Sequence, residues 1–151
     1  MATVELRFSA LPAHVRTARL VAAAVARRSG VDEAVLDEVR LAVGEACSRA
    51  VHLHRQHCPD VPVMVTLVDD EKAFSVAVTD EAPQAQREEQ ATLADLAAAA
   101  DASTDPGSDP DLEPVIPEVG LAVIAGLVED VAVEPGRDRG VVVTMSWPIS
   151  A

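Results

Sequence analysis

Three side chains that could do chemistry together lie at helical spacing in the stretch GEACSRAVHLHR, residues 44–55. Glu45, Arg49 and His52 stand at i, i+4 and i+7, which places a carboxylate, a guanidinium and an imidazole on one stripe of a helix, away from its apolar residues. Two interpretations are open. The stripe is either a solvated Glu45–Arg49 ion pair, whose loss would cost about 0.5 kcal/mol or less, or what remains of a site.

A metal site is a further interpretation of the same segment, because His54, His57 and Cys58 lie at i, i+3 and i+4. Together with Cys47 and His52 they offer the nitrogen and sulfur ligands that zinc prefers. However, Cys47 falls on the apolar side of the helix, and no second half-site occurs elsewhere in the sequence. The sequence therefore favours a chain without a metal site.

The elements that position these residues follow from the hydrophobic pattern. A period of 3.6 residues predicts helices at about 13–29, 32–54 and 119–130, with Gly30 ending the first and Asp32 capping the second. Alternating apolar residues predict strands at 3–10, 61–70, 73–80, 131–135 and 140–149. This order indicates a single α/β domain over 1–151, a two-layer sandwich of a mixed, mostly antiparallel sheet with helices on one face.

Residues 81–117 differ in composition from the rest of the chain. They hold five of the ten prolines and nine acidic residues against one basic residue, Arg87. Residues 90–101 favour a short helix. Residues 102–117 contain too little apolar surface to order themselves, so we expect that part to be mobile.

Composition limits the classes of partner and compartment. The net charge of -13 disfavours sequence-independent nucleic-acid binding, which needs clustered cations. It favours either solubility or a basic protein partner. No apolar run is long enough to span a membrane, and the first residues lack the pattern of a secretory signal. With only two cysteines, we expect reduced thiols and a cytoplasmic location.

Three segments, in this order of elements, resemble one family. LDEVRLAVGEACSRAVHLHR is similar to a helical motif of the ATP-binding domain of the gyrase and histidine-kinase superfamily. VAVTDEAPQ stands where that family has a strand ending in D-x-G-x-G, and EVGLAVIAGLVEDVAVEPGRDRGVVVTMSW resembles its C-terminal part. Within the superfamily, the chain resembles the small bacterial anti-sigma factor kinases of partner-switching systems over essentially its whole length.

The resemblance implies roles for four residues. Glu45 stands where such kinases have the general base toward the substrate serine, and Arg49 stands where they have an asparagine that coordinates magnesium. Asp80 matches the aspartate that accepts the adenine amino group. Gly120 matches one glycine of the phosphate-cradling segment at the start of the last predicted helix.

Departures from the family pattern affect three parts of the nucleotide site. A guanidinium has no lone pair to offer magnesium, so Arg49 cannot replace the asparagine. Residues 81–83 read Glu-Ala-Pro, so both glycines of the adenine loop are missing. The segment that would close over a triphosphate is acidic and, between Asp80 and Glu118, contains the single glycine Gly107. These departures indicate a lost nucleotide site.

The first predicted helix carries a candidate partner surface. Arg16, Arg19 and Arg27 lie on its polar face, which is cationic in a chain of net charge -13. Such a face is usually only solvated. The resemblance, however, implies that relatives contact their partners through the first helix, so we expect these arginines to bind a partner.

We therefore predict an anti-sigma-type regulatory protein that binds a sigma factor, an anti-sigma factor antagonist, or both in mutually exclusive complexes. No cofactor is expected, and a homodimer is compatible with these expectations. The alternative is an active serine kinase that uses ATP and magnesium, with Glu45 as base and Glu38 helping to hold the metal. A sensor that reuses the vacated cleft is a third interpretation with little support in the sequence.

Overall fold

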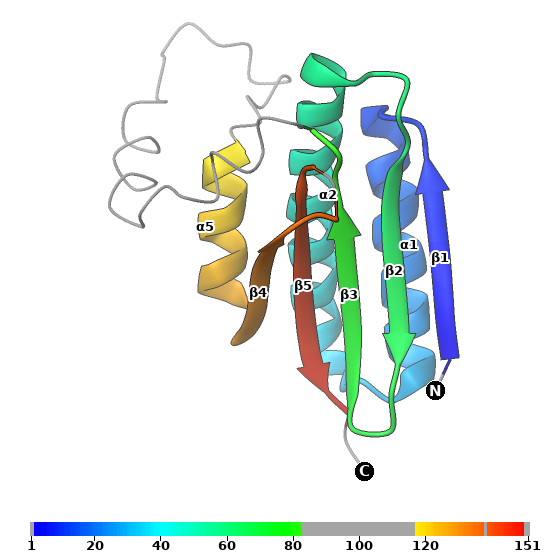
Figure 1. The fold of residues 1–151 in the computed structure, drawn as a ribbon. Helices are drawn as coiled ribbons and strands as arrows, with labels where there is room; N and C mark the ends of the chain where they lie inside the picture. Colours follow the sequence, from blue (N-terminus) through cyan, green and yellow to red (C-terminus); the bar gives the residue numbers. More distant parts are fainter. Residues whose placement is uncertain (1, 83–116, 138, 150–151) are drawn as a thin grey trace, which may run out of the picture.

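Five strands and three helices form two layers in the computed structural model, which describes residues 2–82, 117–137 and 139–149 (Figure 1). The strands are β1 (Ala2–Phe8), β2 (Val63–Asp69), β3 (Ala73–Thr79), β4 (Asp130–Pro135) and β5 (Val141–Pro148). They form one sheet in the order β1-β2-β3-β5-β4, and each of these neighbouring pairs is antiparallel. The helices lie together on one face of this sheet (Figure 1). The predicted fold class is confirmed.

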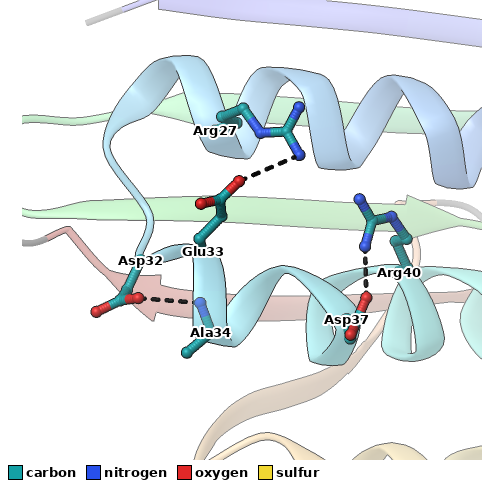
Figure 2. A network of polar contacts seen from close by, with 6 residues as sticks. All are labelled: Arg27, Asp32, Glu33, Ala34, Asp37 and Arg40. Carbon is teal, nitrogen blue, oxygen red and sulfur yellow. Dashed lines mark hydrogen bonds and ion pairs between the residues drawn. The ribbon is translucent and has the colours of Figure 1, made fainter.

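The helices begin and end close to the predicted positions. Helix α1 (Pro12–Ser29) starts with a proline in its first turn and ends at Gly30, whose φ of 106° suits glycine. Asp32 caps a short 3-10 turn, Glu33–Val35, by accepting a hydrogen bond from the Ala34 N–H at 2.9 Å (Figure 2). Helix α2 (Leu36–His57) follows, so it starts and ends a few residues later than predicted. Helix α5 (Pro117–Leu127) starts two residues earlier than predicted.

The core lies between the sheet and the helices. Alternate residues of β2, β3 and β5 are buried, as expected for strands with one covered face. Phe74 and Trp147, on the neighbouring strands β3 and β5, stack with ring centroids 6.1 Å apart. Helix α2 contacts α1, α5 and the sheet. Most of its circumference is therefore covered by protein. Residues of its polar stripe, such as Arg49, are consequently not all exposed to solvent.

Part of the sequence prediction falls outside the described residues. The helix expected at 90–101 and most of the mobile segment expected at 102–117 lie within 83–116, which the structure does not describe. In the described ranges, no helix has both the length and the apolar character needed to cross a bilayer.

Candidate functional site

A buried ion pair joins α2 to the end of β3. The Arg49 Nη1 atom donates to the Asp80 Oδ2 atom at 3.0 Å, and each side chain is 1% exposed. Arg49 lies in the second half of α2, and Asp80 is the first residue after β3. Two residues that the sequence places 31 positions apart thus form one charged contact at the edge of the core.

The environment of Arg49 corrects the interpretation of the polar stripe as a solvated face. One of the two interpretations of the sequence is a solvated guanidinium on this stripe. The structure buries the Arg49 side chain and places it in an ion pair with Asp80. The reason is that α2 is covered by α1, α5 and the sheet, so little of its surface faces solvent. The value of about 0.5 kcal/mol applies to exposed pairs, so for the buried Arg49 we expect a larger loss of stability.

Both carboxylate oxygens of Asp80 are engaged by the chain. While Oδ2 accepts from Arg49, Oδ1 accepts a hydrogen bond from the Ala82 N–H at 3.1 Å. The Asp80 N–H donates to the Val141 carbonyl oxygen of β5 at 3.0 Å. Burial raises the pKa of the Asp80 carboxyl above its ordinary value, and Arg49 and the Ala82 N–H act in the opposite direction. The carboxylate is therefore held in one position by its neighbours in the fold.

His54 links α2 to the two segments that flank Asp80 in space. Its ring is fully buried, with Nδ1 2.8 Å from the Val61 carbonyl oxygen and Nε2 2.9 Å from the Glu81 backbone nitrogen. Because a backbone N–H can only donate, Nε2 must accept, and the proton then resides on Nδ1 and is donated to Val61. This geometry assigns a neutral imidazole that bridges the loop before β2 and the chain after β3.

Gly140 is a residue of this region that the sequence analysis did not identify. Its φ is +78°, and a Cβ built at this position would lie 2.0 Å from the Asp80 carbonyl oxygen. The turn before β5 therefore packs directly against the backbone of Asp80 and Glu81. The two glycines of the GRDRG segment were the available signal, because a glycine next to a strand often marks a turn or a close backbone approach.

Replacing Gly140 with alanine is expected to lower the free energy of unfolding by about 2 kcal/mol or more, because the new methyl group meets backbone atoms at a positive φ. Gly126→Ala is the matched control. No atom lies within 4 Å of the Cβ position at Gly126, in the last turn of α5, so alanine there should be neutral or stabilising. Chemical denaturation of both variants measures the difference. Equal stability of the two would show that the turn does not pack against Asp80 as described.

The remaining residues that the resemblance assigned to a nucleotide site lie on α2 and α5. Glu45 is half-buried on α2, one turn before Arg49, and Gly120 lies in the first turns of α5. Glu38 lies in the first turn of α2, roughly 16 Å along the helix axis from Arg49. Its Oε1 accepts a hydrogen bond from the Trp147 Nε1–H at 3.0 Å. That contact gives Glu38 a structural partner far from Asp80.

The ligands proposed for a metal site do not come together in the described part of the chain. No group of three or more His, Cys, Asp or Glu side chains there has the arrangement of a metal site. Burial raises the pKa of the Cys47 thiol to about 12, so the thiol is protonated at neutral pH. Both ring nitrogens of His54 are engaged by Val61 and Glu81.

The described residues do not fit ATP and magnesium in the arrangement that the resemblance implies. An adenine amino group at Asp80 would compete with the Arg49 guanidinium for the carboxylate, and its entry would separate a buried cation from Asp80. The same guanidinium carries donors only, so it cannot serve as a magnesium ligand. Arg49 therefore disfavours binding of both the adenine and the magnesium ion.

The three arginines of the expected partner surface divide into two groups. Arg16 and Arg19 lie in the first half of α1 and are exposed. Arg27 lies in the last turn, and its Nη2 is 3.8 Å from the Glu33 carboxylate (Figure 2). Among the described residues, no carboxylate forms an ion pair with Arg16 or Arg19. Arg27 therefore has a carboxylate of its own chain beside it, whereas Arg16 and Arg19 have no such ion pair among the described residues.

A family model described as the histidine kinase-like ATPase domain matches residues 8–147. A comparison with curated proteins found no match. The matched range begins at the end of β1 and ends in β5, so it includes Arg49, Asp80 and His54.

Proposed function

Because the chain belongs to the histidine kinase-like ATPase domain family, we propose that it is an anti-sigma-type regulatory protein that acts by binding partner proteins and not by phosphoryl transfer. Its partners would be a sigma factor and an anti-sigma factor antagonist, held in mutually exclusive complexes. Exchange between the two complexes would then release or sequester the sigma factor.

The buried Arg49–Asp80 pair is the observation that carries this proposal. It supports loss of nucleotide binding, because one residue engages the adenine-contacting carboxylate and also replaces the magnesium-ligating asparagine of the family. A member of this family that cannot hold ATP retains the two-layer scaffold and its surfaces. Binding is the activity that such a scaffold can still perform.

The competing function is an active serine kinase, with Glu45 as general base. Phosphoryl transfer depends mainly on positioning and on neutralising charge around the phosphates. The Arg49–Asp80 pair and the Trp147 contact of Glu38 give no support to that arrangement. If phosphorylation of an antagonist controls the exchange, a separate kinase must then supply it.

A binding panel tests the proposal. The chain is mixed with each sigma factor and each anti-sigma factor antagonist of its source organism, with and without ATP and magnesium, and complexes are separated by size-exclusion chromatography. We expect at least one sigma factor and one antagonist to bind, to compete with each other, and to do so equally well without nucleotide. Failure of every sigma factor and antagonist to bind would refute the proposal, and an absolute requirement for ATP would contradict the proposed mechanism.

A further inference from the structure

The outer side of the α1–α2 helix pair is hollowed along its length. One hollow, of about 550 Å³, lies between the start of α1 and the end of α2. A second, of about 320 Å³, lies between α1 and the first half of α2. Arg16 and Arg19 line both, so the two hollows adjoin. We call them together the α1–α2 groove.

The groove combines positive charge with an apolar lining. Arg16 and Arg19 of α1 and Arg55 of α2 are exposed in it, and among the described residues none of these three forms an ion pair. Val15 and Val51 line the first hollow from the buried side. The chain as a whole has a net charge of -13, so this concentration of arginines is opposite in sign to the rest of the molecule.

Two exposed leucines, one from each helix, line the second hollow. Leu20 of α1 is 59% exposed and Leu41 of α2 is 45% exposed, and they are two of the four large apolar side chains that the described residues expose. Arg40, which also lines this hollow, is paired with Asp37 (Figure 2). The apolar contacts available to a ligand therefore lie at two levels of the groove, with Arg16 and Arg19 between them.

Arg19 is held in the groove by a glycine of the facing helix. A Cβ built at Gly44 would lie 2.5 Å from the Arg19 Cδ atom, so the methylene stem of Arg19 lies against the bare backbone of α2. Long side chains often bury their stems in this way and keep their charged ends in water. The stem of Arg19 therefore packs at Gly44, while the side chain as a whole remains exposed.

We infer that the α1–α2 groove binds an acidic amphipathic helix of a partner protein. This inference rests on the proposed function and names the chemistry of the partner. The two apolar levels, at Val15 and Leu20, are separated by roughly 7 Å along α1, which is close to the step between positions i and i+4 of a bound helix. Carboxylates beside those apolar residues would meet Arg16, Arg19 and Arg55. Arg27 lies outside the groove and takes no part.

A designed peptide tests the chemistry of the groove without a known partner. The probe is a fluorescent helical peptide of about 18 residues, roughly 27 Å long, with leucines along one face and glutamates flanking them. A control peptide carries lysines in place of the glutamates. Fluorescence anisotropy should detect binding of the glutamate peptide and not of the lysine peptide, with weaker binding at high salt. Equal binding of both peptides would overturn the inference.

Charge-matched variants then locate the site. Arg16→Glu with Arg19→Glu should weaken binding at least tenfold, mainly through slower association, whereas Arg27→Glu with Arg28→Glu makes the same charge change on the same helix and should leave affinity within about twofold. Leu20→Ser with Leu41→Ser, and separately Gly44→Ala, should also weaken binding in chains that remain folded by circular dichroism. Equal losses of peptide affinity from both arginine pairs would mean that only net charge matters, and would refute binding in the groove.

The same variants are applied to the complex found in the binding panel. If a sigma factor or antagonist binds and the groove variants bind it normally, the groove inference fails and the proposed function stands. If no such protein binds and the groove still selects the acidic peptide, the proposed function fails and the groove stands. Sedimentation of the wild type and the Arg16, Arg19 variant tests self-association. A variant that loses only dimer formation would identify the occupant as a second copy and overturn the inference.

Discussion

Asp80→Asn is expected to lower the free energy of unfolding by about 3 kcal/mol or more, because removal of one partner of a buried ion pair withdraws the counter-charge from the other. Arg49 and Asp80 are each 1% exposed and lie 3.0 Å apart. The asparagine keeps the shape of the side chain and an oxygen for the Ala82 N–H. Its amide NH2 group then faces Arg49, so the variant removes both the charge and the acceptor for the Arg49 Nη1–H. Urea denaturation measures the loss.

A double-mutant cycle separates the pair from the other contacts of each residue. Arg49→Met should also be strongly destabilising, and the double variant Arg49→Met with Asp80→Asn should lose less than the sum of the single losses, by about 1.5 kcal/mol or more. Asp37→Asn is the control, because Asp37 pairs with Arg40 on the surface with 93% of its side chain exposed, and we expect little change there. Additive single losses would contradict a direct Arg49–Asp80 interaction.

His54→Leu is expected to cost about 3 kcal/mol, because it removes a side chain that satisfies two backbone groups. The buried imidazole donates to the Val61 carbonyl oxygen and accepts from the Glu81 N–H. A leucine of similar size fills the space but cannot replace the hydrogen bonds of the histidine to the Val61 carbonyl oxygen and the Glu81 N–H. His57→Leu, at an exposed position of the same helix, is the control and should have little effect.

An intermediate variant assigns the two hydrogen bonds of His54. In His54→Asn, the amide nitrogen can occupy the place of Nδ1 and donate to Val61, but no atom reaches Glu81. We therefore expect a loss smaller than that of His54→Leu and about 1 kcal/mol or more. If His54→Leu proved as stable as the wild type, the two hydrogen bonds of His54 would not stabilise the fold.

The sequence allowed the fold to be predicted in most of its elements. Strands such as β2 and β3 alternate buried and half-buried residues, and that alternation is visible in the residue types themselves. Capping residues such as Asp32 and Gly30 located the helix ends to within a few residues. These features are local, so a single sequence contains the information needed to predict them.

The candidate site was predicted less well, because its contacts are not local. A helical pattern places Arg49 on the polar stripe of α2, but the pattern does not show that α1, α5 and the sheet cover that helix. Asp80 was identified through the resemblance alone, and its contact with Arg49 joins residues distant in sequence. The close approach of Gly140 to Asp80 likewise depends on the neighbouring positions of β3 and β5 in the sheet.

Restoring the asparagine of the family should not restore catalysis. Arg49→Asn removes the guanidinium, but residues 81–83 still lack the glycines that the adenine loop of the family contains. Phosphoryl transfer needs the whole constellation in position. We therefore expect no transfer of radiolabel from ATP to any antagonist by wild type or by Arg49→Asn. Transfer by the wild type that Glu45→Ala abolishes would identify the chain as an active kinase.

Calorimetric titration of the wild-type chain with ATP and magnesium tests the central claim most directly. The protein is first shown to be folded, and an ATP-binding member of the same family serves as the positive control. Because Arg49 engages Asp80 and cannot ligate magnesium, we predict no saturable heat at micromolar nucleotide. A dissociation constant below about 10 μM, equivalent to about -7 kcal/mol, would contradict the loss of the nucleotide site.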